Sequence, residues 1–170
     1  MGFQMTSSKY KPQLLGLVVA VIWTALDQIS KSIAQATLSK GPHFFFGHVG
    51  FALVYNFGFA FSLASGKTIV VSLFEVGISI FVLYSLAKTT DLPMAIAYGL
   101  ILGGAFGNIA DRFFRNNHGG VIDFIYTGFW PTFNVADVGV VVGLILIFFL
   151  IRRPRRRGEV DSLKSNESPS

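Results

Sequence analysis

Four long apolar stretches constrain this chain more than any other feature of its sequence. They span residues 13–30, 68–87, 93–110 and 135–151, and each approaches the roughly 20 residues that a helix needs to cross a hydrocarbon core. Only 14% of the residues are charged, too few to cover the surface of a soluble domain. Backbone groups in lipid must be paired internally, so the sequence predicts an all-α membrane bundle of four transmembrane helices.

The Lys and Arg residues predict how this bundle is oriented. Four spans put both termini on one side, which receives nine of these cations, and leave five on the other side. The positive-inside rule therefore predicts cytoplasmic termini and outward-facing segments 32–67 and 111–134. We expect residues 1–151 to form the membrane domain. We expect residues 152–170 to form a basic, disordered cytoplasmic tail that meets anionic lipid headgroups.

The residue types that are rare exclude several kinds of chemistry. The chain has no Cys, which removes disulfides, thiolate nucleophiles and Cys-ligated metals. It has only three His, so a His-rich metal site is not expected either. The sequence therefore predicts no metal, no cofactor and no nucleic-acid partner, and we expect a monomer among membrane lipids.

Glycines recur at helical spacing in the last two apolar stretches. Gly99, Gly103 and Gly107 do so in the third stretch, and Gly139 and Gly143 do so in the fourth. Small residues at this spacing let membrane helices approach closely, and packing alone explains them. Two helices packed in this way would bring together the polar groups at their shared end.

Residues 56–62 alternate large and small side chains. Phe57, Phe59 and Phe61 face one side, and the smaller residues between them, Gly58 included, face the other. This period of two predicts a strand whose aromatic face lies in the outer membrane interface and whose small face admits another backbone. An aromatic anchor belt without a ligand explains the same pattern.

Charged residues cluster at the predicted outer ends of the helices. Asp27 and Lys31 are four residues apart, so they can pair with each other. Asp111 has Arg112 beside it and Arg115 four residues on, which favours an ionised, structural carboxylate. Asn108 lies one turn before Asp111 and can join that network.

Two further acids differ in their surroundings. Asp123 has apolar neighbours and no basic residue within five positions, so desolvation is expected to raise its pKa. Asp137 stands near a predicted helix N-terminus, where the dipole favours a carboxylate. One acid pushed toward neutrality beside one kept ionised is the arrangement of a shared-proton dyad, in which one carboxylate activates water and the other protonates a carbonyl. Helix capping or an interfacial ion pair is the structural alternative for each acid.

Five polar blocks follow one another along the chain and carry a family resemblance. They are Asp27-Gln28-Ile29-Ser30-Lys31, Asn56-x-Gly58-x-Ala60-Phe61, Gly103-Gly104-Ala105-x-Gly107-Asn108-x-x-Asp111-Arg112, Val121-x-Asp123-Phe124 and Phe133-Asn134-x-Ala136-Asp137. With these blocks, residues 13–151 resemble the lipoprotein signal peptidase (signal peptidase II) family. The resemblance implies a four-helix aspartic endopeptidase of the bacterial inner membrane, with its site at the periplasmic face. Such an enzyme removes signal peptides from diacylglyceryl-modified prolipoproteins and cuts before the lipidated Cys.

The resemblance also assigns roles to individual positions. By motif, it implies that Asp123 and Asp137 are the catalytic pair. The other matched positions would shape the site or contact substrate: Asp27, Lys31, Asn56, Gly58, Gly107, Asn108, Asp111, Arg112 and Asn134. Three features depart from the family pattern, namely the bulky Phe57 and Phe59, the short spacing of thirteen residues between the two acids, and Glu75, which matches no motif.

Two other functions compete with this interpretation. A Ser–Lys protease could use Ser30 with Lys31 or Ser65 with Lys67, but a general-base Lys must be neutral, and Lys31 is expected to pair with Asp27. A small proton-coupled transporter could use acids such as Glu75 as a relay, but the sequence has no visible inverted repeat.

Overall fold

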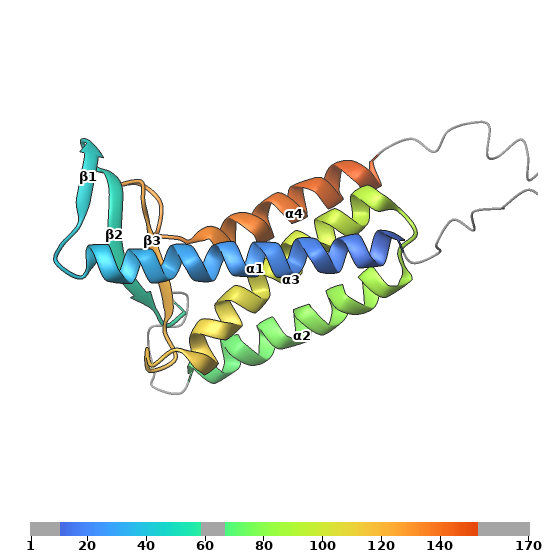
Figure 1. The fold of residues 1–170 in the computed structure, drawn as a ribbon, viewed down its shortest axis with the longest axis horizontal. Helices are drawn as coiled ribbons and strands as arrows, with labels where there is room; N and C mark the ends of the chain where they lie inside the picture. The colour runs from blue at the N-terminus through green and yellow to red at the C-terminus, as the bar shows by residue number, and fades with distance from the viewer. Residues whose placement is uncertain (1–10, 59–66, 153–170) are drawn as a thin grey trace, which may run out of the picture.

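The structure is a computed structural model that describes residues 11–58 and 67–152. In chain order its elements are α1 (Lys11–Leu38), β1 (His43–Phe46), β2 (Val49–Asn56), α2 (Lys67–Lys88), α3 (Leu92–Phe114), β3 (Val121–Tyr126) and α4 (Val135–Ile151). The helices run roughly along one long axis, and the strands gather at one end of the bundle (Figure 1). The predicted fold class is confirmed, whereas the predicted tail lies outside the described residues from position 153 onward.

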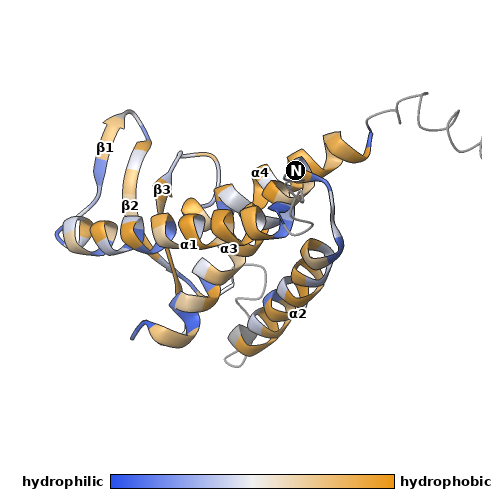
Figure 2. Cartoon of the chain, turned by 45° about the vertical axis from the view of Figure 1, so that its right-hand side comes forward, coloured by the Kyte–Doolittle hydropathy of each residue, from blue (hydrophilic) through white to orange (hydrophobic). Residues whose placement is uncertain are grey.

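The outer surface of the bundle suits a lipid environment. Helices α1, α2 and α3 are long and apolar enough to cross a membrane, and α4 is a shorter apolar helix of 17 residues. Apolar colouring covers the outward faces of the helices (Figure 2), and on α2 the side chains of Phe74 and Phe81 are each 69% exposed. Exposed apolar area of this extent marks a surface that contacts an apolar partner, here the hydrocarbon of a membrane.

Helix α1 extends eight residues beyond the predicted stretch, to Leu38. Its last turns carry Ala34 and Leu38, which are 4% and 7% exposed and pack against Ile122 and Phe124 of β3. These apolar contacts stabilise the extra turns and attach the sheet to the bundle. They fix β3, and with it Asp123, against the C-terminal end of α1.

Glycines bring the helices of the bundle into close contact, as predicted. A Cβ on Gly103 of α3 would lie 2.7 Å from Cβ of Trp23 and 2.8 Å from the carbonyl oxygen of Ala20, both on α1. A Cβ on Gly143 of α4 would lie 2.6 Å from Cγ1 of Ile101 on α3. Helix α3 therefore packs on both α1 and α4.

The three strands form one antiparallel sheet in the order β1-β2-β3. In the β2–β3 pair, Val54 lies opposite Asp123 and Asn56 lies opposite Val121. This register places the end of β2 beside the acid of β3. The sheet confirms the predicted small β element, although β1 and β2 lie earlier in the chain than the strand that the sequence pattern indicated, and β3 lies later.

The strand predicted over residues 56–62 is not formed at residues 57 and 58. Strand β2 ends at Asn56, where that prediction began. Gly58 has a φ of 95°, in the left-handed region, and its N–H donates to Oδ1 of Asn56 at 2.9 Å, which turns the chain out of the sheet. Residues 59–62 lie outside the described residues, so the predicted aromatic and small faces stay a prediction there.

Candidate active site

A buried ionic cluster joins α1 to α3 at the end of the bundle where the sheet lies. Nζ of Lys31 lies 2.8 Å from Oδ2 of Asp27 and 2.9 Å from Oδ2 of Asp111, and all three side chains are 0% exposed. The same ammonium donates to Oδ1 of Asn108 at 2.9 Å. The predicted pair of Asp27 and Lys31 is therefore confirmed, and a second carboxylate shares the same cation.

Asp111 also connects this cluster to the sheet. Its Oδ2 accepts the backbone N–H of Ile122 on β3 at 2.9 Å, and its Oδ1 lies 3.1 Å from Nε of Arg115. The predicted contact with Arg115 is confirmed. Arg112 is not a partner of Asp111, because adjacent residues point to different sides of a helix, whereas residues four apart share one face.

Arg112 instead reaches across to α2, where it pairs with Glu75. Its Nη1 lies 2.5 Å from Oε2 of this acid, which matched no motif in the sequence. The signal that could have found the pair is a lone acid inside an apolar span, since such an acid needs a cation. The pairing also removes support for the transporter hypothesis, which used Glu75 as a proton carrier.

Asp27 and Gly107 bring α4 into the cluster. Oδ1 of Asp27 accepts the backbone N–H of Ala136, in the first turn of α4, at 2.9 Å. A Cβ on Gly107 would collide with the Asp27 carboxylate, so only glycine leaves room for it. Thus the cluster holds three helix ends and β3 in fixed relative positions.

Asp123 projects from β3 toward the side chains of Asn56 and Asn134 and is 1% exposed. Its Oδ2 accepts Nδ2 of Asn56 at 2.9 Å, and its Oδ1 accepts Nδ2 of Asn134 at 2.7 Å. The pKa of Asp123 is raised to about 6, mainly by burial; the nearby charge of Asp137 acts in the same direction, and the two amide donors oppose it. The direction and cause predicted from the apolar neighbours are confirmed.

Asp137 belongs to the N-terminal cap of α4. Its backbone N–H donates to Oδ1 of Asn134 at 2.9 Å, and its Oδ2 accepts the backbone N–H of Asn134 at 3.2 Å. These two bonds form a capping box. Its Oδ1 also accepts Nδ2 of Asn108 at 3.0 Å. The predicted position near a helix N-terminus is confirmed.

Asn134 connects the two acids to each other. It donates to Asp123 through its side chain and forms the capping box with Asp137. Its Nδ2 also donates to Oδ1 of Asn108, at 3.2 Å. Motif matching singled out both asparagines, but their bonding pattern appears only when β3, α3 and α4 are assembled. The arrangement holds two carboxylates, joined through Asn134, in unlike environments.

Other candidate groups lie in places that do not suit catalysis. The hydroxyl of Ser30 donates to the backbone oxygen of Asp27 at 2.8 Å, and Lys31 is held by two carboxylates, so this pair does not form a Ser–Lys dyad. Ser65 lies outside the described residues. Gly58 stands beyond the end of β2, where a Cβ would lie 3.1 Å from Cγ2 of Val71 on α2. Among residues 11–58 and 67–152, no group of three or more His, Asp or Glu is placed to hold a metal ion.

Solved structures place this architecture among bacterial membrane enzymes. One, solved by the in meso method at 1.9 Å resolution, superposes with a TM-score of 0.73 at 28% identity and covers 82% of this chain and 93% of that chain. A second, at 2.3 Å resolution, gives a TM-score of 0.67 at 27% identity and covers 92% of this chain and 93% of that chain.

Sequence comparison then gives the family. The model of the signal peptidase II family matches residues 19–152, and the chain belongs to this family. A lipoprotein signal peptidase of Rhodococcus jostii is 42% identical over 147 residues, which cover 83% of this chain and 74% of that protein. One of Mycobacterium tuberculosis is 42% identical over 139 residues, which cover 79% of this chain and 69% of that protein. The family predicted from the five polar blocks is confirmed.

Proposed function

We propose that this chain is an intramembrane aspartic endopeptidase that removes signal peptides from diacylglyceryl-modified bacterial prolipoproteins, cutting before the lipidated Cys. Family membership supports the reaction class. The single observation that carries the assignment of the site is Asn134, which hydrogen-bonds to Asp123 and to Asp137. We assign these two acids as the catalytic pair.

In this proposal the two carboxylates divide the proton work. Asp123 is the general acid, because its pKa of about 6 keeps part of it protonated near neutral pH. Asp137 is the general base, because it accepts N–H donors from Asn108 and Asn134 at a helix N-terminus, an environment that favours a carboxylate.

Hydrolysis would follow from these two states. A water molecule between the acids loses a proton to Asp137 as its oxygen attacks the scissile carbonyl, and Asp123 protonates the carbonyl oxygen. In the resulting tetrahedral diol, one hydroxyl gives its proton to Asp123 as the carbonyl re-forms and the C–N bond breaks, and Asp137 gives its proton to the leaving amine nitrogen. Both acids then recover their starting states.

The other residues that match the family motifs support the two catalytic acids. Lys31 with its two buried carboxylates fixes the helix ends, and the side chain of Asn56 orients the Asp123 carboxylate through a 2.9 Å bond. Arg112 carries donors that suit a substrate carbonyl, and we place it among the substrate-binding groups. Gly58 would lie beside the bound peptide.

The proposal includes an orientation and a location. The excess of Lys and Arg on the side of the termini supports cytoplasmic ends and a site at the outer face of the cytoplasmic membrane. We further propose that residues 1–151 form the peptidase domain, that residues 152–170 form a cytoplasmic tail, and that the chain acts as a monomer in contact with membrane lipids.

The direct test is incubation of the purified protein with a lipidated and an unlipidated form of one prolipoprotein, read as a gel shift. The proposal predicts cleavage of the lipidated form and little or none of the other. Equal cleavage of both would contradict the substrate class. Proton flux in liposomes without any peptide, together with no cleavage, would favour the transporter alternative.

A further inference from the structure

Arg112 pairs with Glu75, an acid that has no role in the proposed catalytic mechanism. Its Nη1 donates to Oε2 of Glu75 at 2.5 Å and so connects α3 to α2. The Arg112 side chain is 6% exposed and the Glu75 side chain 21% exposed, so both charges are largely buried. A planar guanidinium bound to a carboxylate has a fixed orientation, because the direction of its remaining N–H groups follows from the bond already made.

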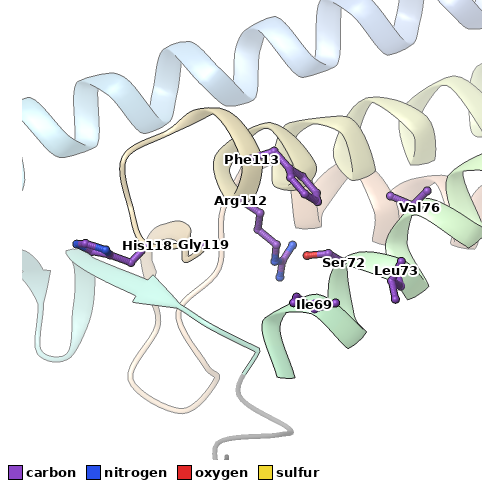
Figure 3. Close-up of a pocket in the computed structure, with 8 residues that line it drawn as sticks. All are labelled: Ile69, Ser72, Leu73, Val76, Arg112, Phe113, His118 and Gly119. Atoms are coloured by element: carbon purple, nitrogen blue, oxygen red, sulfur yellow. The ribbon is translucent and has the colours of Figure 1, made fainter. Parts of the chain in front are cut away.

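The guanidinium lines a cavity of about 420 Å³ next to the outer end of α3. Figure 3 shows the Arg112 side chain reaching from α3 toward Ser72 and Ile69 of α2. The other walls are mainly apolar and include Leu73 and Phe113. A cavity with apolar walls and one cationic group suits a ligand that is apolar with a single polar acceptor.

Donors remain on this guanidinium after Glu75 is bound. Arg carries five N–H donors, and the bond to Glu75 uses one group, Nη1. Nε of Arg112 is buried and has no hydrogen-bond partner among the residues that the structure describes. An unpaired buried donor favours any ligand that supplies an acceptor. Because Glu75 already neutralises the charge of Arg112, an uncharged carbonyl oxygen fits this site better than an anion.

We propose that Glu75 is a positioning residue for substrate recognition. It fixes the Arg112 guanidinium in the cavity wall so that Arg112 donates to a carbonyl oxygen of the prolipoprotein beside an apolar chain. This inference rests on the proposed function. Two substrate groups have this chemistry, a peptide carbonyl of the apolar signal segment and an ester carbonyl of the diacylglyceryl group.

The test measures binding, so that it does not depend on cleavage. A diacylglyceryl-modified signal peptide is titrated against the full chain carrying Asp137→Asn, with and without Glu75→Gln. Loss of one well-oriented hydrogen bond should raise Kd about tenfold. The control is Ser79→Ala, one turn along α2, which removes a hydroxyl that donates only to the backbone oxygen of Glu75 at 2.7 Å and should leave Kd within about twofold.

Two additions separate a positioning role from a structural one and identify the carbonyl. In an Arg112→Lys background, Glu75→Gln should change Kd by less than about twofold, because its effect passes through Arg112. An ether-linked peptide lacks the ester carbonyl. If Glu75→Gln weakens the ester-linked peptide alone, the ester is the acceptor, and if it weakens both peptides, the acceptor is a peptide carbonyl.

The outcomes that overturn the inference are distinct from those that overturn the proposed function. Unchanged Kd in Glu75→Gln for both peptides, or an undiminished tenfold effect in the Arg112→Lys background, removes the positioning role. If Glu75→Gln does not fold, Glu75→Asp replaces it in the test, because Asp keeps the charge on a side chain shorter by one methylene. We then expect a Kd between those of the unmutated site and the tenfold-weakened one. An unchanged Kd overturns the inference. A different result would overturn only the proposed function. In that case the unmutated protein cleaves no prolipoprotein, although binding of the peptide still depends on Glu75.

Discussion

Asp111→Asn should lower the stability of the folded protein as well as stop the reaction. The Asp111 carboxylate is 0% exposed and contacts Lys31 at 2.9 Å, Arg115 at 3.1 Å and the backbone N–H of Ile122 at 2.9 Å. Asparagine keeps the shape and one acceptor but removes the negative charge. Lys31 is then left with Asp27 as its single anionic partner among the described residues, and the cluster carries excess positive charge in a buried site.

The burial of this ion pair sets the size of the expected loss of stability. Breaking a buried ion pair by removing one partner costs about 3–5 kcal/mol, because the other charge stays buried without compensation. Total folding stabilities are about 5–15 kcal/mol, so the loss is a large fraction of the whole. For a chain of this length each kcal/mol lowers Tm by about 2–4 °C, which predicts a fall of roughly 10 °C.

The assay is thermal unfolding in detergent, run beside a cleavage assay on the same samples. Asp91→Asn is the matched control, because Asp91 caps α3 through a 2.8 Å bond to the N–H of Met94 and asparagine caps helices equally well. We expect the control to keep its Tm and Asp111→Asn to lose both Tm and activity. A stable but inactive Asp111→Asn, together with an active Asp123→Asn, would show that the dyad is wrongly assigned.

Three further predictions concern pH, orientation and metals. The folded pKa of Asp123 is about 6 and its ordinary value is 3.8, so the folded state binds the extra proton between these values. The free energy of unfolding should therefore fall by about 3 kcal/mol as pH rises from about 3 to about 7, with about 2 kcal/mol of this fall between about pH 4 and 6. A stability profile of Asp123→Asn should lack that slope; an identical slope in the variant would refute the cause. A reporter fused after Ile151 should read cytoplasmic and one inserted near Gly41 should read outside, whereas a periplasmic C-terminus would place both acids on the wrong side. EDTA should leave peptide cleavage unchanged, because the proposed chemistry uses two carboxylates and water; inhibition that added Zn²⁺ or Mg²⁺ reverses would contradict it.

The sequence predicts the helices and the nearest ionic contacts because both depend on local spacing. Apolar length locates the four helices, and the spacing of Asp27 and Lys31 places them on one helical face. The positions of the helices and of this pair need no knowledge of how distant segments meet. The burial of Asp123 agrees with its apolar neighbours in the chain, but Ile122 and Phe124 pack against α1, and the side chain of Asp123 contacts Asn56 and Asn134 instead.

Contacts between distant segments were harder to predict. Glu75 and Arg112 are 37 residues apart on different helices, and nothing in either neighbourhood indicates the other. The alternation of Phe and small residues favours a strand after Asn56, whereas the chain turns at Gly58, whose N–H donates to the side chain of Asn56. The double role of Asn134, which binds one acid by its side chain and caps the helix of the other, depends on how β3 and α4 meet.

The most direct measurement of the central claim is cleavage of one lipidated prolipoprotein by purified Asp123→Asn and Asp137→Asn proteins. Each variant should keep a Tm no lower than that of the unmutated protein by more than a few degrees. Each should lose activity by at least about 100-fold, the contribution expected of a positioned acid or base. Substantial cleavage by either folded variant would contradict the assignment of Asp123 and Asp137 as the catalytic pair.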